Sequence, residues 1–211
     1  MQGFDLNSFD LNNNHLAPNR YFDRHFDQDA VKILPGEYFA TRDNTLIVTV
    51  LGSCVSVCLS DAKLKIGGMN HFLLPNDSSA NQDILGDSAR YGGYAMEILI
   101  NHMLKLGARR SSLVAKIFGG GNVLRGINAT QVGQRNASFI QAYLKTERIA
   151  ILASDLLENY PRKVYFFPAT GKVFVRKLKA LHNSTILDRE SAYRLRIRNT
   201  LIMGDIELFG D

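Results

Sequence analysis

The residues best suited to covalent chemistry are one cysteine and one histidine, Cys54 and His71. A cysteine thiolate is a strong nucleophile, and a neighbouring imidazole lowers the thiol pKa from its usual value of about 8.5. The same imidazole can then protonate a leaving amine and afterwards activate a water molecule. This pair therefore indicates nucleophilic catalysis through a thiolate–imidazolium couple.

Two β-rich runs must bring these side chains together. Residues 55–59 and 66–74 are rich in β-formers, and we expect them to form a hairpin. A two-residue loop at Ala62-Lys63 places Cys54 directly opposite His71, with Cβ atoms about 4.5 to 5.5 Å apart. At that separation the thiol and the imidazole can form a hydrogen bond.

The residues just before Cys54 are predicted to complete the site. Gly52 lets the backbone turn sharply, so that N–H groups around Ser53 and Cys54 can stabilise an oxyanion. The Thr49 hydroxyl is the candidate for orienting the imidazole. Because residues 49 and 54 differ in strand parity, we expect a bend or bulge at Leu51-Gly52 that brings their side chains to one side.

Other reactive residue types are given structural roles. Cys58 has no titratable neighbour in the pattern and is expected to fill the core. The glycines at 119–121 lack the Lys-Ser/Thr of a phosphate loop and predict close backbone packing near the site. There is no zinc-type Cys/His set, so we expect neither a metal nor a cofactor. The remaining histidines are predicted to be surface or packing residues: His15, His25, His102 and His182.

Composition sets the class of protein. The chain has 211 residues, 45% of them hydrophobic, which favours one globular domain with a sizeable core. Four residues of a strand span roughly 13 Å, and a disulfide needs Cα atoms within about 7 Å, so Cys54 and Cys58 are not expected to pair. Without a signal-peptide pattern or a membrane span, we expect a cytoplasmic protein. The net charge of +5 is a mild excess, so nucleic-acid binding is not expected.

The order of predicted elements is hairpin, helix, strand, helix, strand, hairpin. It favours an α+β or α/β sandwich in which helices cover a mainly antiparallel or mixed β-sheet. The expected domains are a flexible polar extension at 1–30, a compact domain at 31–187 and a basic C-terminal tail at 188–211. The later elements are expected as helices at 88–106 and 136–148, strands at 113–118 and 149–153, and a hairpin of 163–167 with 172–178.

The motifs together resemble the chemoreceptor glutamine deamidase family CheD. Gly52-Ser53-Cys54 and Asn70-His71 carry the resemblance, which spans about residues 30 to 180 in consistent order. The sequence departs from the usual family pattern after Asp155, where residues 156–160 replace a more common glycine-rich turn. The matching segments are 49–59, 67–75, 94–97, 116–122, 133–136 and 168–173.

The resemblance implies a protein-glutamine glutaminase, an amidohydrolase with a cysteine nucleophile. Such an enzyme hydrolyses side-chain amides of particular glutamines on methyl-accepting chemotaxis receptors, giving glutamate and ammonia. The family triad maps onto Cys54, His71 and Thr49; in some members the threonine stands one residue earlier, where this chain has Val48. The implied fold is a sandwich similar to the cytotoxic necrotizing-factor deamidase toxins, here within residues 31–187.

Two other functions fit the same residues. A non-catalytic chemotaxis adaptor would bind receptors or a CheC-type phosphatase, which the resemblance names as a partner, and would leave the cysteine idle. A cysteine protease or a transglutaminase would use the same nucleophile on another substrate. A change in receptor mass separates the deamidase from the adaptor, and peptide cleavage or amine cross-linking would reveal the third class.

Overall fold

The structure is a computed structural model, and it describes residues 19–75, 84–123, 129–178 and 188–195. The last of these stretches, 188–195, is helical. Before it, the described elements in chain order are β1 (Asn19–Asp23), β2 (Gln28–Lys32), β3 (Tyr38–Thr41), β4 (Leu46–Leu51), β5 (Val55–Asp61), β6 (Ile66–Asn70), α1 (Ile84–Lys105), the short 3-10 helix η2 (Arg110–Ser112), β7 (Val114–Gly119), α2 (Ala129–Thr146), β8 (Ala150–Leu156), β9 (Arg162–Phe167) and β10 (Lys172–Lys177).

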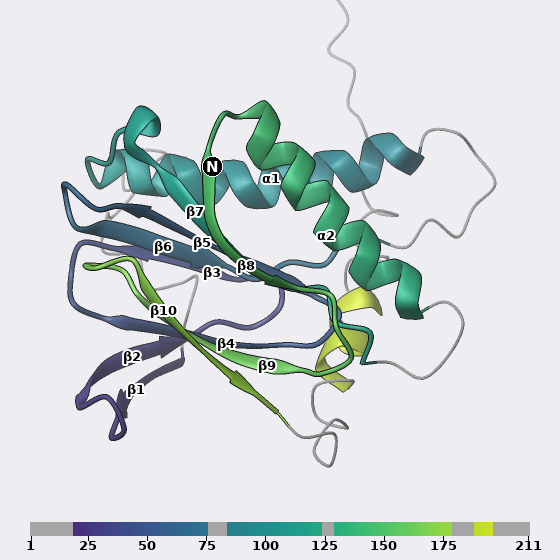
Figure 1. Cartoon of the computed structure of the whole chain (residues 1–211), viewed down its shortest axis with the longest axis horizontal. Coiled ribbons are helices and arrows are strands. Elements are labelled where there is room, and N and C mark those ends of the chain that lie inside the picture. Colours follow the sequence, from purple (N-terminus) through teal and green to yellow (C-terminus); the bar gives the residue numbers. More distant parts are fainter. Residues whose placement is uncertain (1–18, 76–83, 124–128, 179–187, 196–211) are drawn as a thin grey trace, which may run out of the picture.

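The described strands form two five-stranded sheets. The first sheet has the order β1-β2-β4-β9-β10 and the second has the order β3-β6-β5-β7-β8. Both are mixed, because β2 pairs with β4 in parallel, and β7 pairs with β8 in parallel, while the other pairs are antiparallel. Figure 1 shows α1 and α2 on one side of the second sheet and the first sheet on its other side.

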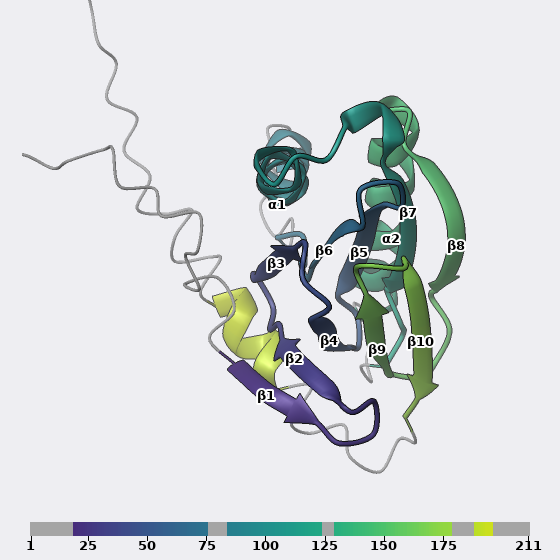
Figure 2. The ribbon, with the colours of Figure 1, turned by 90° about the vertical axis from the view of Figure 1, so that its left-hand side faces the viewer.

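Side-chain alternation along β5 explains this layering. Val55, Val57 and Leu59 pack in the cluster that includes Met96 and Leu99 of α1. The alternate positions lie in the cluster between the two sheets, where Cys58 packs as the core residue that the sequence predicted. Figure 2 shows the same order of layers from the side: helices, second sheet, first sheet.

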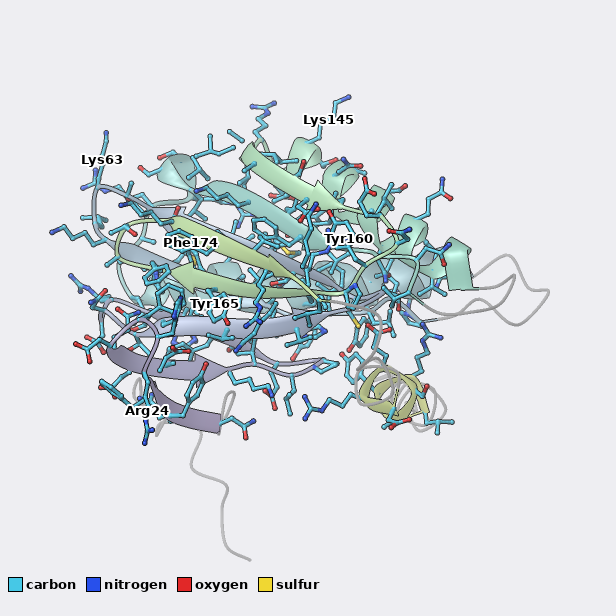
Figure 3. All side chains as sticks on the ribbon, turned by 60° about the horizontal axis from the view of Figure 1, so that its bottom comes forward. Arg24, Lys63, Lys145, Tyr160, Tyr165 and Phe174 are labelled. Atoms are coloured by element: carbon cyan, nitrogen blue, oxygen red, sulfur yellow. The ribbon has the colours of Figure 1, made fainter. Side chains whose placement is uncertain are left out.

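The outer face of the first sheet carries an aromatic cluster. Phe26 lies 5.0 Å from Tyr165, 5.2 Å from Phe167 and 5.9 Å from Phe174, measured between ring centroids. Figure 3 shows Tyr165 and Phe174 on neighbouring strands of this face. These rings join the turn after β1 to the β9-β10 hairpin and cover this face of the first sheet.

The predicted fold class is confirmed, since helices cover mixed sheets in an α+β sandwich. The predicted β9-β10 hairpin is present, with Lys172 paired to Phe167 across the four-residue turn. The sequence named one sheet where the structure has two. None of the described helices is long and apolar enough to cross a membrane.

Three predictions of organisation are corrected. Residues 19–30 were assigned to a flexible extension, but they form β1 and most of β2 in the first sheet. Residues 188–195 were assigned to a basic tail, but they form a helix whose Glu190 is buried. Residues 1–18, 179–187 and 196–211 lie outside the described part of the chain, and so do His15 and His182.

The third correction concerns the register of the β5-β6 hairpin. Asp61 pairs with Ile66, so the loop has four residues and not two. The Asp61 carboxylate accepts the N–H groups of Lys63 and Leu64, both at 3.2 Å, and Lys65 closes the loop in the left-handed region at φ +56°. This local hydrogen bonding favours the longer turn, and it moves the pairing by two residues.

Candidate active site

The three predicted catalytic residues project into the layer between the two sheets. Thr49 lies on β4 with Ile47 and Leu51, whose side chains belong to the inter-sheet cluster. Cys54 belongs to the same cluster from the second sheet, and His71 follows β6 on the face of that sheet to which Met69 points. Thr49 is completely buried, Cys54 is 0% exposed and His71 is 2% exposed.

The bend that was expected between Thr49 and Cys54 is a passage from one sheet to the other. β4 belongs to the first sheet and β5 to the second, so the chain crosses the inter-sheet layer at residues 52–54. Thr49 therefore enters the layer from the first sheet, and Cys54 lies in the same layer just before the first residue of β5 in the second sheet. Because Thr49 and Cys54 do not share a strand, no β-bulge is needed to bring their side chains into the same layer.

The Thr49 hydroxyl fixes the tautomer of His71. It donates a hydrogen bond to the carbonyl oxygen of Ile33 at 2.8 Å, and it lies 2.7 Å from Nδ1 of His71. Because its only proton goes to Ile33, the hydroxyl accepts the Nδ1–H of the ring. The lone pair is then on Nε2, which is buried and has no hydrogen-bond partner among the described residues.

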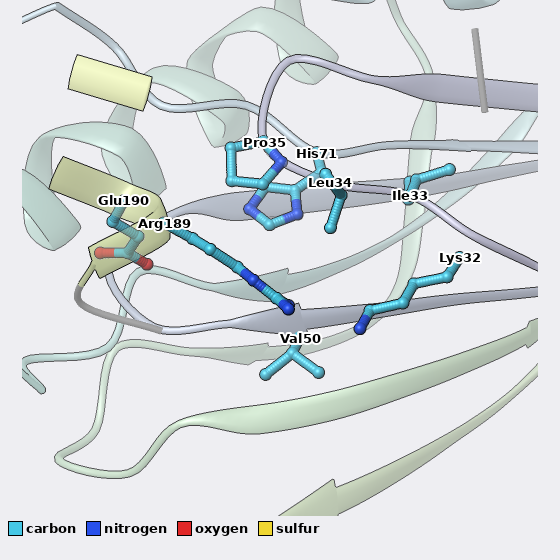
Figure 4. Close-up of a pocket in the computed structure, with 8 residues that line it drawn as sticks. All are labelled: Lys32, Ile33, Leu34, Pro35, Val50, His71, Arg189 and Glu190. Atoms are coloured by element: carbon cyan, nitrogen blue, oxygen red, sulfur yellow. The ribbon is translucent and has the colours of Figure 1, made fainter. Parts of the chain in front are cut away.

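The backbone of His71 is held on both sides by the loop that follows β2. The N–H of Gly36 donates to the carbonyl of His71 at 2.7 Å, and the N–H of His71 donates to the carbonyl of Glu37 at 2.9 Å. A small pocket of about 20 Å³ lies beside the ring, which is room for about one water molecule. Figure 4 shows Pro35 and Leu34 next to the imidazole. Glu190 and Arg189 line the same pocket from the helical segment 188–195.

Cys54 is not directly opposite His71. Val55 bridges to Phe72, so the register places Cys54 opposite Leu73, two residues beyond His71. A shift of two keeps both side chains on the same face of the sheet, as diagonal neighbours roughly 7 to 8 Å apart at the backbone. The described contacts include no hydrogen bond between Cys54 and His71.

Both groups are neutral in this arrangement. Burial raises the pKa of the Cys54 thiol well above its ordinary value, and the charge and hydrogen bond of Glu190 raise it further, while Arg194 lowers it. Burial lowers the pKa of His71 to about 3. The expected thiolate–imidazolium couple is therefore absent from this conformation of the protein.

Backbone N–H groups next to the cysteine converge on one oxygen atom. The N–H groups of Gly52, Ser53 and Cys54 donate to Oε1 of Glu190 at 3.1, 2.8 and 3.2 Å. The Ser53 hydroxyl donates to Oε2 of the same carboxylate at 2.5 Å. The arrangement is a concave set of donors for a negatively charged oxygen, the kind of group that stabilises an oxyanion.

Asn136 and the glycines at 119–120 hold this backbone in place. Asn136 of α2 donates to the carbonyl of Ser53 at 2.9 Å and accepts the N–H of Leu74 at 3.0 Å, so it joins the chain before Cys54 to the chain after His71. The N–H of Gly120 donates to the carbonyl of Cys54 at 2.7 Å. Gly119 has φ +111° and no room for a Cβ against that carbonyl, which confirms the close backbone packing predicted for the glycines.

Sequence reasoning missed Glu190, Arg194 and the clamping role of Asn136. Arg194 donates to the Ser53 hydroxyl at 3.1 Å from the same helical segment as Glu190. The available signal for Asn136 was its place in the segment 133–136, which supported the family resemblance. Glu190 lies far along the chain in a charged stretch, and no local pattern marks it. Within the described residues there is no group of three or more His, Cys, Asp or Glu side chains that could hold a metal.

Comparisons with known proteins identify the family of this chain. A family model described as CheD chemotactic sensory transduction matches residues 73–177. A Shewanella oneidensis protein named probable chemoreceptor glutamine deamidase CheD 1 is 68% identical over 194 residues, which cover 92% of this chain and 94% of that protein. A Dechloromonas aromatica protein of the same name is 57% identical over 92% of this chain and 96% of its own. A Janthinobacterium protein named probable chemoreceptor glutamine deamidase CheD is 54% identical over 95% of this chain and 98% of its own. This chain therefore belongs to the CheD family.

Proposed function

We propose that this chain is a chemoreceptor glutamine deamidase, which hydrolyses side-chain amides of specific glutamines on methyl-accepting chemotaxis receptors through a thioester on Cys54. The observation that carries the proposal is the set of three N–H groups converging on one carboxylate oxygen beside the cysteine. The names of the relatives support the substrate, since they describe chemoreceptor glutamine deamidases. The cytoplasmic location expected from the sequence belongs to this proposal.

In the first half of the proposed reaction, the thiol gives its proton to Nε2 of His71 and the sulfur attacks the carbonyl carbon of the glutamine side chain. A C–S bond forms, and the N–H groups of Gly52, Ser53 and Cys54 bind the oxyanion. His71 then returns the proton to the amide nitrogen. The C–N bond breaks, and ammonia leaves from the thioester.

In the second half, a water molecule gives a proton to Nε2 of His71 and its oxygen attacks the thioester carbonyl. A C–O bond forms, the C–S bond breaks, and His71 returns the proton from Nε2 to the sulfur, which yields glutamate, the free thiol and the neutral imidazole. The room beside His71 is of the right size for one water molecule. Thr49 takes no proton in either half; its hydroxyl keeps the Nε2 lone pair available by holding Nδ1–H.

The test uses the full chain and a receptor cytoplasmic fragment, with the intact mass of the receptor as the readout. We expect wild type to raise that mass by replacing –NH₂ with –OH, and we expect Cys54→Ala to lose the activity by several orders of magnitude. Cys58→Ala is the matched control, because it removes a thiol that is equally buried but lies away from the Gly52–Cys54 donors. Normal deamidation by Cys54→Ala would overturn the mechanism.

The same experiment separates the other functions. An adaptor would bind the receptor fragment and leave its mass unchanged in every variant. A protease would release shorter peptides, and a transglutaminase would add an amine to the receptor. Binding to a CheC-type phosphatase is compatible with deamidation, and co-elution of the two purified proteins tests it separately.

A further inference from the structure

The helical segment 188–195 fills the candidate active site with one side chain. Its Glu190 is 2% exposed, and its carboxylate accepts hydrogen bonds from the three N–H groups at residues 52–54 and from the Ser53 hydroxyl. All the donors around the expected oxyanion position are therefore engaged. No substrate carbonyl can reach them while the segment is in place.

Two further side chains anchor the segment. Tyr193 is 5% exposed and packs in the inter-sheet cluster, and its hydroxyl is hydrogen-bonded to that of Tyr91 on α1. Its ring also covers Gly36, where a Cβ would lie only 2.5 Å from Tyr193 Cε2. Arg194 donates to Ser53, as described above. The segment is thus fitted to the site through its inner face, while Asp188 and Arg189 beside Glu190 are exposed.

The chemistry of Glu190 matches the proposed reaction in one specific respect. Glutamine deamidation produces a glutamate side chain, and Glu190 presents a glutamate carboxylate to the donors that would bind the oxyanion. Its negative charge beside the sulfur also raises the pKa of the Cys54 thiol. A bound product would have the same two effects, since it would occupy the donors and disfavour the thiolate.

We propose that residues 188–195 are an intramolecular product analogue that blocks the active site with Glu190, and that a substrate glutamine carried on a helix takes their place. This proposal rests on the proposed function. Glu190 reaches the donors from a helical segment, so the surface around the cysteine accepts a helix with one side chain pointing inward. Free glutamine would lack the packing that Tyr193 supplies, which favours a protein-bound substrate.

The first experiment measures access to the cysteine without any substrate. Iodoacetamide labelling is followed by peptide mapping, and Cys58 serves as the internal reference because it is buried in the core. We expect Glu190→Ala to speed labelling of Cys54 roughly ten- to hundredfold, the size expected when hydrogen bonds to a charged group are lost. Asp188→Ala is the matched control, since it removes an exposed carboxylate from the same segment and should label at the wild-type rate.

The second experiment measures deamidation of the receptor fragment. We expect Glu190→Ala to lower KM for the fragment and to raise the initial rate at low substrate, because the internal competitor is weakened. Asp188→Ala should match wild type. A lower rate for Glu190→Ala, with wild type active and the variant folded by circular dichroism, would show that Glu190 assists catalysis and would overturn the proposal.

A third experiment uses the conservative variant Glu190→Gln, whose carboxamide oxygen can still accept the three N–H groups at residues 52–54 and keep the segment docked. Its amide nitrogen cannot accept the Ser53 hydroxyl, so this one hydrogen bond is lost. The introduced carboxamide then lies where a substrate amide would lie. We expect the enzyme to hydrolyse it in a single turnover, so that the protein regains the wild-type mass. The double variant with Cys54→Ala should keep the lower mass. Persistence of the carboxamide in an enzyme that deamidates receptors normally would overturn the proposal.

The outcomes separate the two proposals. Faster Cys54 labelling in Glu190→Ala without deamidation of receptors by any variant would remove the proposed function and keep the blocking role of the segment. Normal deamidation by wild type, with labelling and KM unchanged in Glu190→Ala, would keep the function and remove the blocking role.

Discussion

The orientation of His71 depends on a single hydroxyl group. Thr49 bonds both Ile33 and Nδ1 of the ring, and its position in the first sheet is set by β4, whose neighbours are β2 and β9. A histidine that turned over would present Nδ1 to the cysteine and lose the lone pair at Nε2. The threonine is therefore a positioning residue for the proposed reaction.

We expect Thr49→Val to lower kcat by about 10- to 100-fold with little change in KM, because the imidazole loses the partner that fixes its tautomer. Thr49→Ser should recover most of the activity, since its hydroxyl can make the same two hydrogen bonds. Single-turnover deamidation of the receptor fragment measures both variants. Equal loss in the serine and valine variants would show that Thr49 acts through packing and not through its hydroxyl.

The residues that the sequence assigned to the candidate site lie near one another along the chain. Cys54, Gly52 and Ser53 are adjacent, and the hairpin pattern linked them to His71. Glu190 could not be predicted in this way, because its contact with residues 52–54 depends on how a distant helix packs and no local periodicity records it. The neutral state of the thiol was missed for the same reason, since burial between two sheets and the charge of Glu190 cause it.

At the scale of elements, the turn between β8 and β9 has two consecutive non-glycine residues in a conformation that favours glycine. Leu157 and Glu158 are consecutive residues in the left-handed region, with φ of +65° and +64°. The buried Arg162 holds the turn by hydrogen bonds to the carbonyls of Asp155 and Leu157 and by an ion pair with Asp155 at 2.9 Å. The turn stands where the family resemblance led us to expect glycine.

We expect Glu158→Gly to be about 1 kcal/mol more stable to urea unfolding than Glu158→Ala, because glycine adopts a left-handed conformation without a Cβ clash. The comparison with alanine matters, since both variants lose the same charge near Arg162 and differ only in the Cβ atom. The backbone N–H of Asn122 donates to the carbonyl of Glu158 at 2.7 Å in either case. A glycine variant less stable than the alanine variant would show that the turn carries no such strain.

The hairpins show what local sequence can and cannot determine. The turn Pro168-Ala169-Thr170-Gly171 predicted the β9-β10 hairpin correctly, because Pro and Gly favour the dihedral angles that the turn needs. The predicted β5-β6 register was wrong by two residues. The sequence did not reveal that the Asp61 side chain and a left-handed Lys65 stabilise a loop of four residues. Strand runs were recognisable, but their division between two sheets depends on long-range pairing such as that of β4 with β9.

At the scale of the whole molecule, the two sheets bury two titratable groups and shift the pKa of each in the direction that favours its neutral form. Burial lowers the pKa of His71 to about 3, whereas the unfolded chain binds a proton at this residue near pH 6.5. Burial raises the pKa of Cys54, so the unfolded chain loses the thiol proton at a lower pH than the folded protein does. Folding stability must therefore fall on both sides of neutral pH for reasons that belong to this site.

The direction in which pH changes the free energy of unfolding follows from counting the protons bound in each state. Below pH 6.5 the unfolded state holds a proton on His71 that the folded state lacks, so the free energy of unfolding drops by about 1.4 kcal/mol per pH unit, or about 2 kcal/mol between pH 6.5 and 5. We expect His71→Gln to lose this part of the acid dependence, while other groups such as His102 keep theirs.

We expect Cys54→Ala to lose the decline in stability at alkaline pH and to keep the decline at acid pH. Urea unfolding of the three proteins, followed from pH 5 through neutral to alkaline pH, measures both limbs. Parallel acid limbs in wild type and His71→Gln would mean that the imidazole is protonated in the folded protein and that it is not the neutral base with a free Nε2 on which the proposed reaction depends.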